Sequence, residues 1–303
     1  MIEQTASWLG GQLLWEAIKE SPSWKRHFLA NRRVVENWPE RLNAEFDGRF
    51  RILCDDIEPP TIHAGGRIEL QTRKLKNSAA KIKDQLLENG KPDDPHAIVS
   101  ENHIYNRSNL SVSVGIMNFS EIMALRAEGQ KPNILSTCSV IVCSETQEIL
   151  IHHRSHDSAT FPNALHVIGG SIIPPGYNTT DPDRASTLSS MQREIFEETQ
   201  ITVDVDDIPN IIFSEEIETG FIQVNFLGLR ATKKSLARLS SNWEGDVKRV
   251  HFDNLPEILA DGFWVPSGKA QILAWLALGA ANGGRRPKFN GLSSEELFNK
   301  HVQ

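Results

Sequence analysis

The chain has 303 residues, which is enough for two modest domains or for one elaborated domain. Its hydrophobic fraction of 39% is typical of a globular protein, and its net charge of −7 argues against a nucleic-acid partner, which would require a basic face. Three cysteines cannot form a disulfide framework and lack zinc-ligand spacing, so we expect a reducing, cytoplasmic location. The longest apolar run, 272–281, is too short to span a bilayer, and the N-terminus lacks a signal-peptide pattern, so we expect no membrane partner.

The first part of the chain alternates short helical and extended patterns. It predicts, in chain order, a helix at 12–37, strands at 51–54 and 67–72, a polar helix at 78–88, a loop at 90–95, a half-buried strand at 109–115 and a helix at 119–126. The stretch 129–132 ends that helix and suggests a boundary. We therefore divide the chain into an α+β region, 1–132, and a second region, 133–303.

The second region predicts strands before and after a central helix. The strands are expected at 137–143, 149–152, 211–213, 221–229 and 247–252, followed by helices at 255–259 and 267–281. Periodicity alone would assign only a mixed α/β class.

The central helix carries the most informative pattern of the chain. Residues 193–201 read Arg-Glu-Ile-Phe-Glu-Glu-Thr-Gln-Ile, which places Glu194, Glu197 and Glu198 at spacings that share one helix face. Asp181-Pro182 is a typical helix start, and an apolar stripe follows it. Charged helix faces are most often merely solvated. Three clustered carboxylates are also what a hard cation such as Mg²⁺ requires.

This run resembles the C-terminal half of the Nudix box, the signature of Nudix hydrolases. Upstream, Gly169-Gly170 follows an apolar strand and resembles the opening of the box. The opening half departs from the signature, because about nine residues are inserted before Arg193. The position of the first family glutamate is Ala185, and the late glycine is Gln200. The resemblance implies a Nudix α/β/α sandwich with a mixed sheet, preceded by the smaller α+β region, which would shape the substrate pocket.

The resemblance also implies roles for particular residues. Glu194, Glu197 and Glu198 are expected to bind Mg²⁺ or Mn²⁺, and Arg193 is expected to orient one of them. A further ligand or base often follows the box, for which Glu244 is our first candidate. The rival cluster Glu215, Glu216 and Glu218, with Glu218 preferred, is otherwise a solvated loop.

Substrate contacts are expected on both sides of the insertion. Arg154, at the end of the strand before the box, is expected near the substrate phosphates, and Gly169 and Gly170 are expected to give the backbone a tight path beside the metal. His152 and His153 are adjacent, so they point to opposite faces of a strand and cannot share an ion. The turn-rich residues 174–177 suggest a lid. A basic cluster is more simply a solvated face than a phosphate site: Arg67, Arg73, Lys74, Lys76, Lys81 and Lys83.

The function implied is metal-dependent hydrolysis of a nucleoside diphosphate that is linked to another moiety. The expected partner of the protein is therefore this small molecule. The layout over roughly 110–280 resembles the Nudix-type UDP-sugar pyrophosphatases, so a UDP-sugar such as UDP-glucose is the first substrate expected. ADP-ribose, NADH or a dinucleoside polyphosphate is the second. A Nudix-fold protein that binds a nucleotide or a partner without turnover stays open, because of Ala185 and Gln200.

Overall fold

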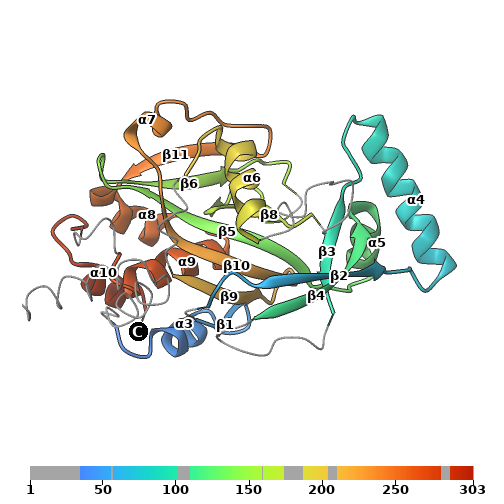
Figure 1. Cartoon of the computed structure of the whole chain (residues 1–303), viewed down its shortest axis with the longest axis horizontal. Coiled ribbons are helices and arrows are strands. Elements are labelled where there is room, and N and C mark those ends of the chain that lie inside the picture. Colours follow the sequence, from blue (N-terminus) through green and yellow to red (C-terminus); the bar gives the residue numbers. More distant parts are fainter. Residues whose placement is uncertain are drawn as a thin grey trace, which may run out of the picture.

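The computed structural model describes residues 35–55, 57–100, 110–158, 160–173, 187–203, 210–280 and 287–302 (Figure 1). Most of the helix predicted at 12–37 lies outside these ranges. The suggested lid at 174–177, the helix start at Asp181-Pro182 and Ala185 also lie outside the described residues.

One mixed sheet forms the centre of the described structure. Its eleven strands are β1 (Phe50–Cys54), β2 (Thr61–Arg67), β3 (Pro95–Val99), β4 (Ser111–Asn118), β5 (Ile134–Cys143), β6 (Glu148–Arg154), β7 (Leu165–His166), β8 (Ile168–Ser171), β9 (Ile211–Glu216), β10 (Phe221–Arg230) and β11 (Gly245–His251). The main path runs β1-β9-β10-β5-β3-β4-β2. Strand β5 also pairs with β8 and β6, and β6 pairs with β7 and β11. The β5–β10 and β2–β4 pairs are parallel and the other strand pairs are antiparallel.

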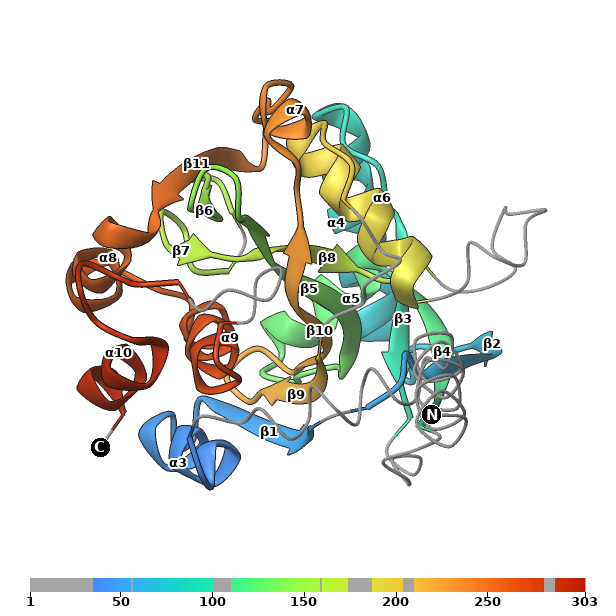
Figure 2. The same ribbon diagram turned by 60° about the vertical axis from the view of Figure 1, so that its left-hand side comes forward.

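Helices cover both faces of this sheet. Strand β5 is buried along its whole length, as expected for an apolar strand between two layers. Val140 faces the core cluster of helix α9 (Pro266–Ala277), and the next residue, Ile141, faces the cluster of helix α6 (Thr187–Thr199). Figure 2 shows α6 and α9 on opposite sides of β5 and β10. This arrangement confirms the expected α/β class, in which a mixed sheet lies between helices.

The remaining helices lie around the ends of the sheet. They are α3 (Trp38–Glu45), α4 (Arg73–Glu88), α5 (Phe119–Ala127), α7 (Lys233–Leu236), α8 (Leu255–Asp261) and α10 (Ser294–His301). Helices α4 and α5 pack on each other beside β4, around a small core of their own. Strands β1 and β3, which precede residue 132, pair with β9 and β5, which follow it, so both predicted regions contribute to one sheet. The boundary at 132 remains a prediction.

One predicted element of the first region needs correction, and two elements of the structure were not predicted. The strand expected at 67–72 is wrong, because β2 ends at Arg67 and α4 already begins at Arg73. Thr72 caps α4 by accepting a hydrogen bond from the Leu75 N–H (3.2 Å), so the residues before the helix form its capping turn. The loop predicted at 90–95 is followed by β3, and α10 lies near the end of the chain; neither element was predicted. Among the described residues, no helix combines the length and the apolar composition needed to cross a membrane.

Candidate active site

Helix α6 places two of the predicted carboxylates in the protein interior. Met191 and Ile195 pack in the core, and this fixes the orientation of the helix. Glu194 and Glu198 are buried, Glu198 with only 3% of its surface exposed, whereas Glu197 is exposed. The interpretation of these glutamates as a solvated acidic face therefore holds for Glu197 but not for Glu194 and Glu198.

Strand β8 packs directly against these two carboxylates. The backbone N–H of Gly169 donates to Oε2 of Glu198 (3.3 Å). A Cβ atom at position 170 would overlap the carboxylate of Glu194, and one at position 169 would overlap the β5 backbone at Thr137 and Cys138. Glycine at both positions is therefore what allows β8 to pair with β5 and still admit the two carboxylates.

Arg193 connects two of the glutamates. Its Nη1 donates to Oε2 of Glu197 (2.6 Å), and its Nη2 donates to Oε1 of Glu194 (2.5 Å) and to the backbone oxygen of Ser171 (3.3 Å). A planar guanidinium can hold two carboxylates at fixed angles, which an ammonium cannot do. Arg193 thus fixes the orientation of the Glu194 side chain from the side of helix α6.

The loop before β11 brings a fourth carboxylate to the cluster. The Glu244 carboxylate lies close enough to Glu198 and Glu194 for its charge to raise the pKa of both. Asn242 fixes this loop, because its Oδ1 accepts from the Glu244 N–H (2.8 Å) and its Nδ2 donates to the Glu197 backbone oxygen (3.3 Å). Glu244, which sequence spacing alone could not place, therefore lies beside the glutamates of the box.

Glu194, Glu198 and Glu244 each have a raised pKa. Burial raises the pKa of Glu194 to about 7, although Arg193 opposes that shift. Burial, followed by the charges of Glu244 and Glu194, raises the pKa of Glu198 well above its usual value. The pKa of Glu244 is also raised, first by burial. The site as a whole disfavours its own negative charges, which is the condition in which a cation binds well.

The donor set fits a hard divalent cation. Carboxylate oxygens are the ligands that Mg²⁺ and Mn²⁺ prefer, and such a cation would lower the raised pKa values and draw the oxygens together. Within the described ranges, no group of three or more histidine, cysteine, aspartate or glutamate side chains is already arranged around one metal position. Glu194, Glu198 and Glu244 are the residues that would hold the ion, with the exposed Glu197 beside them.

Strand β6 adds a histidine and an arginine. His152 is buried, with its Nδ1 3.7 Å from Oε1 of Glu198, and burial lowers the pKa of His152 to about 4. His153 is only partly buried, as expected for the opposite strand face. Arg154 donates to the backbone oxygen and the hydroxyl of Thr160 (3.1 and 3.3 Å), and its charge lowers the pKa of Glu198. Arg154 is thus near the cluster, and its contact with a substrate phosphate remains a prediction.

A second group of buried polar residues was not predicted. It lies under the first turn of α9, where the Ser267 hydroxyl donates to Oε2 of Glu216 (3.2 Å) and lies 3.2 Å from Nε2 of His166. Gln271 donates from Nε2 to Oε1 of Gln223 (3.4 Å) in the same layer. Burial raises the pKa of Glu216 to about 7 and lowers the pKa of His166 to about 3.

The missed signal was the length of strand β9. It was predicted to end at residue 213, but it continues to Glu216, and alternate residues from Ile212 onward face α9. Extending the strand by its period of two would have placed Glu216 inside. Glu218, the preferred member of that acidic cluster, is exposed, and Glu215 forms a 2.6 Å ion pair with Arg51.

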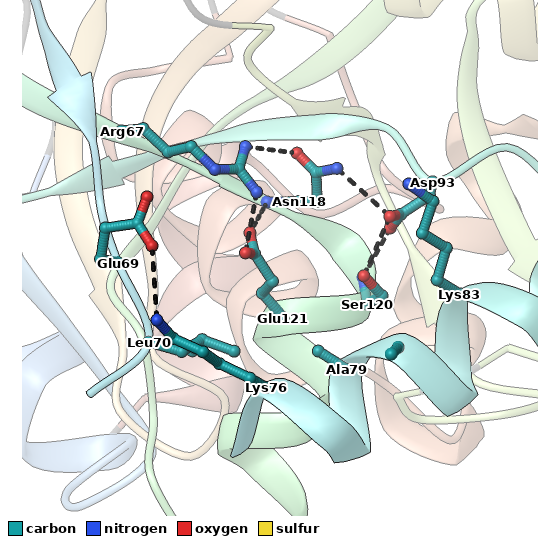
Figure 3. A pocket seen from close by; sticks show the side chains of 11 residues that line it. Arg67, Glu69, Leu70, Lys76, Ala79, Lys83, Asp93, Asn118, Ser120 and Glu121 are labelled. Carbon is teal, nitrogen blue, oxygen red and sulfur yellow. Dashed lines mark hydrogen bonds and ion pairs between the residues drawn. The ribbon is translucent and has the colours of Figure 1, made fainter. Parts of the chain in front are cut away.

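A surface cavity of about 280 Å³ lies away from the carboxylate cluster, between β2, α4 and the start of α5 (Figure 3). Three members of the predicted basic cluster line it, Arg67, Lys76 and Lys83. Glu121 pairs with Arg67 (2.8 Å), and Asp93 accepts hydrogen bonds from the N-terminal turn of α5, where an anion would otherwise bind. The charges of the cavity are therefore largely balanced from within.

Solved structures similar to this chain include MutT and Nudix hydrolases. The MutT protein of Methanosarcina mazei is 24% identical over 46% of this chain and 90% of that protein, with a TM-score of 0.35. A bifunctional NMN adenylyltransferase/ADP ribose pyrophosphatase of Francisella tularensis is 17% identical over 52% of this chain and 44% of that protein, with a TM-score of 0.39. The Ap4A hydrolase of C. elegans is 18% identical over 47% and 97% of the two chains, with a TM-score of 0.31. No protein-family model and no curated protein matches the sequence. With TM-scores below 0.5, these likenesses add nothing to the argument from the site residues.

Proposed function

We propose that the chain is a Nudix-type pyrophosphohydrolase that uses Mg²⁺ or Mn²⁺. The observation that supports this most strongly is the convergence of two buried glutamates of α6, Glu194 and Glu198, with the partly buried Glu244 of the loop before β11 into one mutually repelling cluster. Ion pairs do not balance the cluster: among the described residues Arg193 pairs with Glu194 and Glu197, and Glu198 lies beside His152, whose lowered pKa leaves it neutral. Two buried glutamates with the partly buried Glu244 close to them raise the free energy of the folded state unless a ligand uses them.

The reaction is the addition of water across a diphosphate bond, which gives a nucleoside monophosphate and a second monophosphate from a UDP-sugar, ADP-ribose or NADH, and two nucleotides from a dinucleoside polyphosphate. A bound divalent cation would neutralise the diphosphate oxygens and lower the pKa of a water molecule. Arg193 holds Glu194 in place, and the Gly169 N–H holds Glu198. Glu244 lies close to Glu198 and burial raises the pKa of both, so either carboxylate is a candidate to accept a proton from the attacking water.

The substrate proposed first is a UDP-sugar such as UDP-glucose, on the resemblance of the layout to UDP-sugar pyrophosphatases. ADP-ribose, NADH and dinucleoside polyphosphates are the second candidates, and they contain the same linked diphosphate. We further propose a cytoplasmic location, which the three cysteines and the buried positions of Cys138 and Cys143 support.

The second candidate function is nucleotide binding without turnover. It rested on Ala185, which is outside the described residues, and on Gln200 in place of the family's glycine. Gln200 directly follows α6 and has a left-handed backbone (φ 58°), so it fills the conformational role that glycine has at helix ends. That departure concerns the end of the helix and leaves the carboxylates in place, which favours the enzyme.

A substrate panel tests the proposal. UDP-glucose, ADP-ribose, NADH and a dinucleoside polyphosphate are incubated with Mg²⁺, with Mn²⁺ and with EDTA, and the released monophosphates are measured after phosphatase treatment. Metal-dependent cleavage of at least one compound is the expected result, with UDP-glucose first. Cleavage of a different member would keep the mechanism and replace the substrate. Nucleotide binding by the folded protein without cleavage would favour the second candidate.

A further inference from the structure

The most exposed large apolar side chain among the described residues stands next to the carboxylate cluster. Trp243 has 75% of its surface exposed, and it directly precedes Glu244. Single exposed apolar residues are common on protein surfaces, so exposure by itself assigns no role. Two further features of this tryptophan do assign one.

The first feature is the rigidity of the loop that carries Trp243. The Asn242 side chain bonds to the loop and to the end of α6, the Ser241 hydroxyl accepts from the Val247 N–H (2.9 Å), and the Ser240 N–H donates to the Thr199 backbone oxygen (3.0 Å). A loop tied down by these bonds could bury an indole against the protein. It instead leaves the indole exposed, on the loop that carries Glu244 to the carboxylate cluster.

The second feature is a cation that lies over the indole. The ammonium of Lys91, in the connection between α4 and β3, lies 5.7 Å from the centre of the Trp243 ring, within the range of a cation–π contact. Lys91 and Trp243 are far apart in the sequence, and Trp243 directly precedes Glu244. This contact restrains the indole on one side and leaves most of its surface open. It also brings a positive charge from the first region to the loop that carries Glu244.

We propose that Trp243 is the stacking surface for the nucleobase of the substrate. The proposal rests on the proposed function, since it assumes that the neighbouring carboxylates receive a nucleoside diphosphate. An indole offers a flat, polarisable face, and every base has a π-face that can stack on it, so the contact recognises a nucleobase without selecting one. The chemical class bound at this position is therefore the nucleobase of a nucleotide, and discrimination between bases arises elsewhere.

Binding of reaction products tests this inference independently of turnover. The affinities of UMP, CMP, AMP, GMP and ribose 5-phosphate are measured by calorimetry in Mg²⁺, for the full chain and for Trp243→Ala, Trp243→Phe and Phe196→Ala. Phe196 is the matched control, because it is an aromatic residue, 50% exposed, on the face of α6 turned away from Glu194 and Glu198. Melting temperatures show that each variant is folded.

The expected result is a loss of about tenfold in affinity for all four nucleotides in Trp243→Ala, the size of one lost stacking contact. Trp243→Phe should recover much of the loss, and Phe196→Ala should bind like the unmodified chain. Ribose 5-phosphate, which has no base, should bind equally well to all four proteins.

Three results would overturn the inference: equal nucleotide affinities for Trp243→Ala and the unmodified chain, an equal loss for ribose 5-phosphate and the nucleotides, or no nucleotide binding by the folded chain. Failure of the proposed function is distinguishable from these. In that case nucleotides would bind and depend on Trp243, but no linked diphosphate would be cleaved.

Discussion

Gly170 lies so close to the carboxylate of Glu194 that a single added carbon would occupy the space of the carboxylate oxygens. The strand before the insertion and the helix after it are therefore fitted to each other at the site. This relationship explains why a pair of glycines and a distant glutamate belong to one motif, although the chain between them is longer than in the family signature.

Gly170→Ala should displace Glu194 and impair catalysis without unfolding the protein. The added methyl group meets the movable end of a side chain rather than backbone, so the strand can remain in place. We expect a fall of about 10- to 100-fold in kcat, the usual effect of disturbing the support of a metal ligand. Steady-state kinetics at several Mg²⁺ concentrations would measure it. Gly66→Ala, at a position with open space around it, is the control, and equal kinetics for both variants would contradict the account.

Arg193→Lys should weaken activity because one ammonium cannot hold Glu194 and Glu197 at the angles that the guanidinium provides. The expected loss is about tenfold in kcat/KM, at the lower end of such supporting contacts. The matched control is Arg249→Lys, which alters a comparable two-pronged arginine contact with Glu148 on β6 and β11. If both lysine variants lose activity to the same extent, the effect of position 193 is not specific to the carboxylates.

Gln200→Gly should stabilise the protein. A left-handed backbone destabilises the folded state by about 1–2 kcal/mol when the residue has a side chain. Glycine removes this strain, but the greater conformational entropy of glycine in the unfolded chain offsets roughly half of the stabilisation. We expect the free energy of unfolding to rise by about 0.5–1 kcal/mol, measured by urea denaturation, with kcat unchanged. A destabilised variant would show that the bond from Nε2 of Gln200 to the Phe196 oxygen (3.0 Å) outweighs the strain.

Glu216 should make stability depend on pH. Burial raises its pKa from 4.5 to about 7, so the folded state favours the protonated form. Its contribution is therefore fully present below pH 4.5 and is lost as the pH rises through 7. Relative to the unmodified chain, Glu216→Gln should gain stability between pH 5 and pH 8, by at most roughly 3 kcal/mol. Urea denaturation at both pH values measures this. Glu215→Gln, at a surface ion pair, is the control, and a pH-independent difference for Glu216→Gln would contradict the shift.

Much of the helix and strand pattern could be predicted because it depends on local periodicity. The apolar stripe of α6 and the alternation in β4 are read directly from neighbouring residues, and the structure contains both elements. The carboxylates at 194, 197 and 198 share a face for the same local reason. Their burial could not be read in this way, since it depends on β8 and on the loop at 242–244, which are distant in sequence.

The polar residues beneath α9 could not be predicted from local sequence patterns. Ser267, Gln223 and His166 carry no motif, and they meet only because two strands and a helix bring them together. Glu218 was preferred within its acidic cluster but is exposed, whereas strand β9 carries Glu216 into the interior. Pairing partners decide the length of a strand, and a single sequence does not contain them.

Glu198→Gln tests the central claim most directly, because it keeps the shape of the side chain and removes one buried charge from the cluster. The rate of monophosphate release is measured for the unmodified chain and for this variant, across a range of Mg²⁺ concentrations and on the best substrate of the panel. We predict a fall of about 100-fold or more in kcat, a weaker response to Mg²⁺, and a melting temperature in EDTA that is unchanged or higher. A folded variant with an unchanged rate would contradict the proposal that these carboxylates carry the reaction.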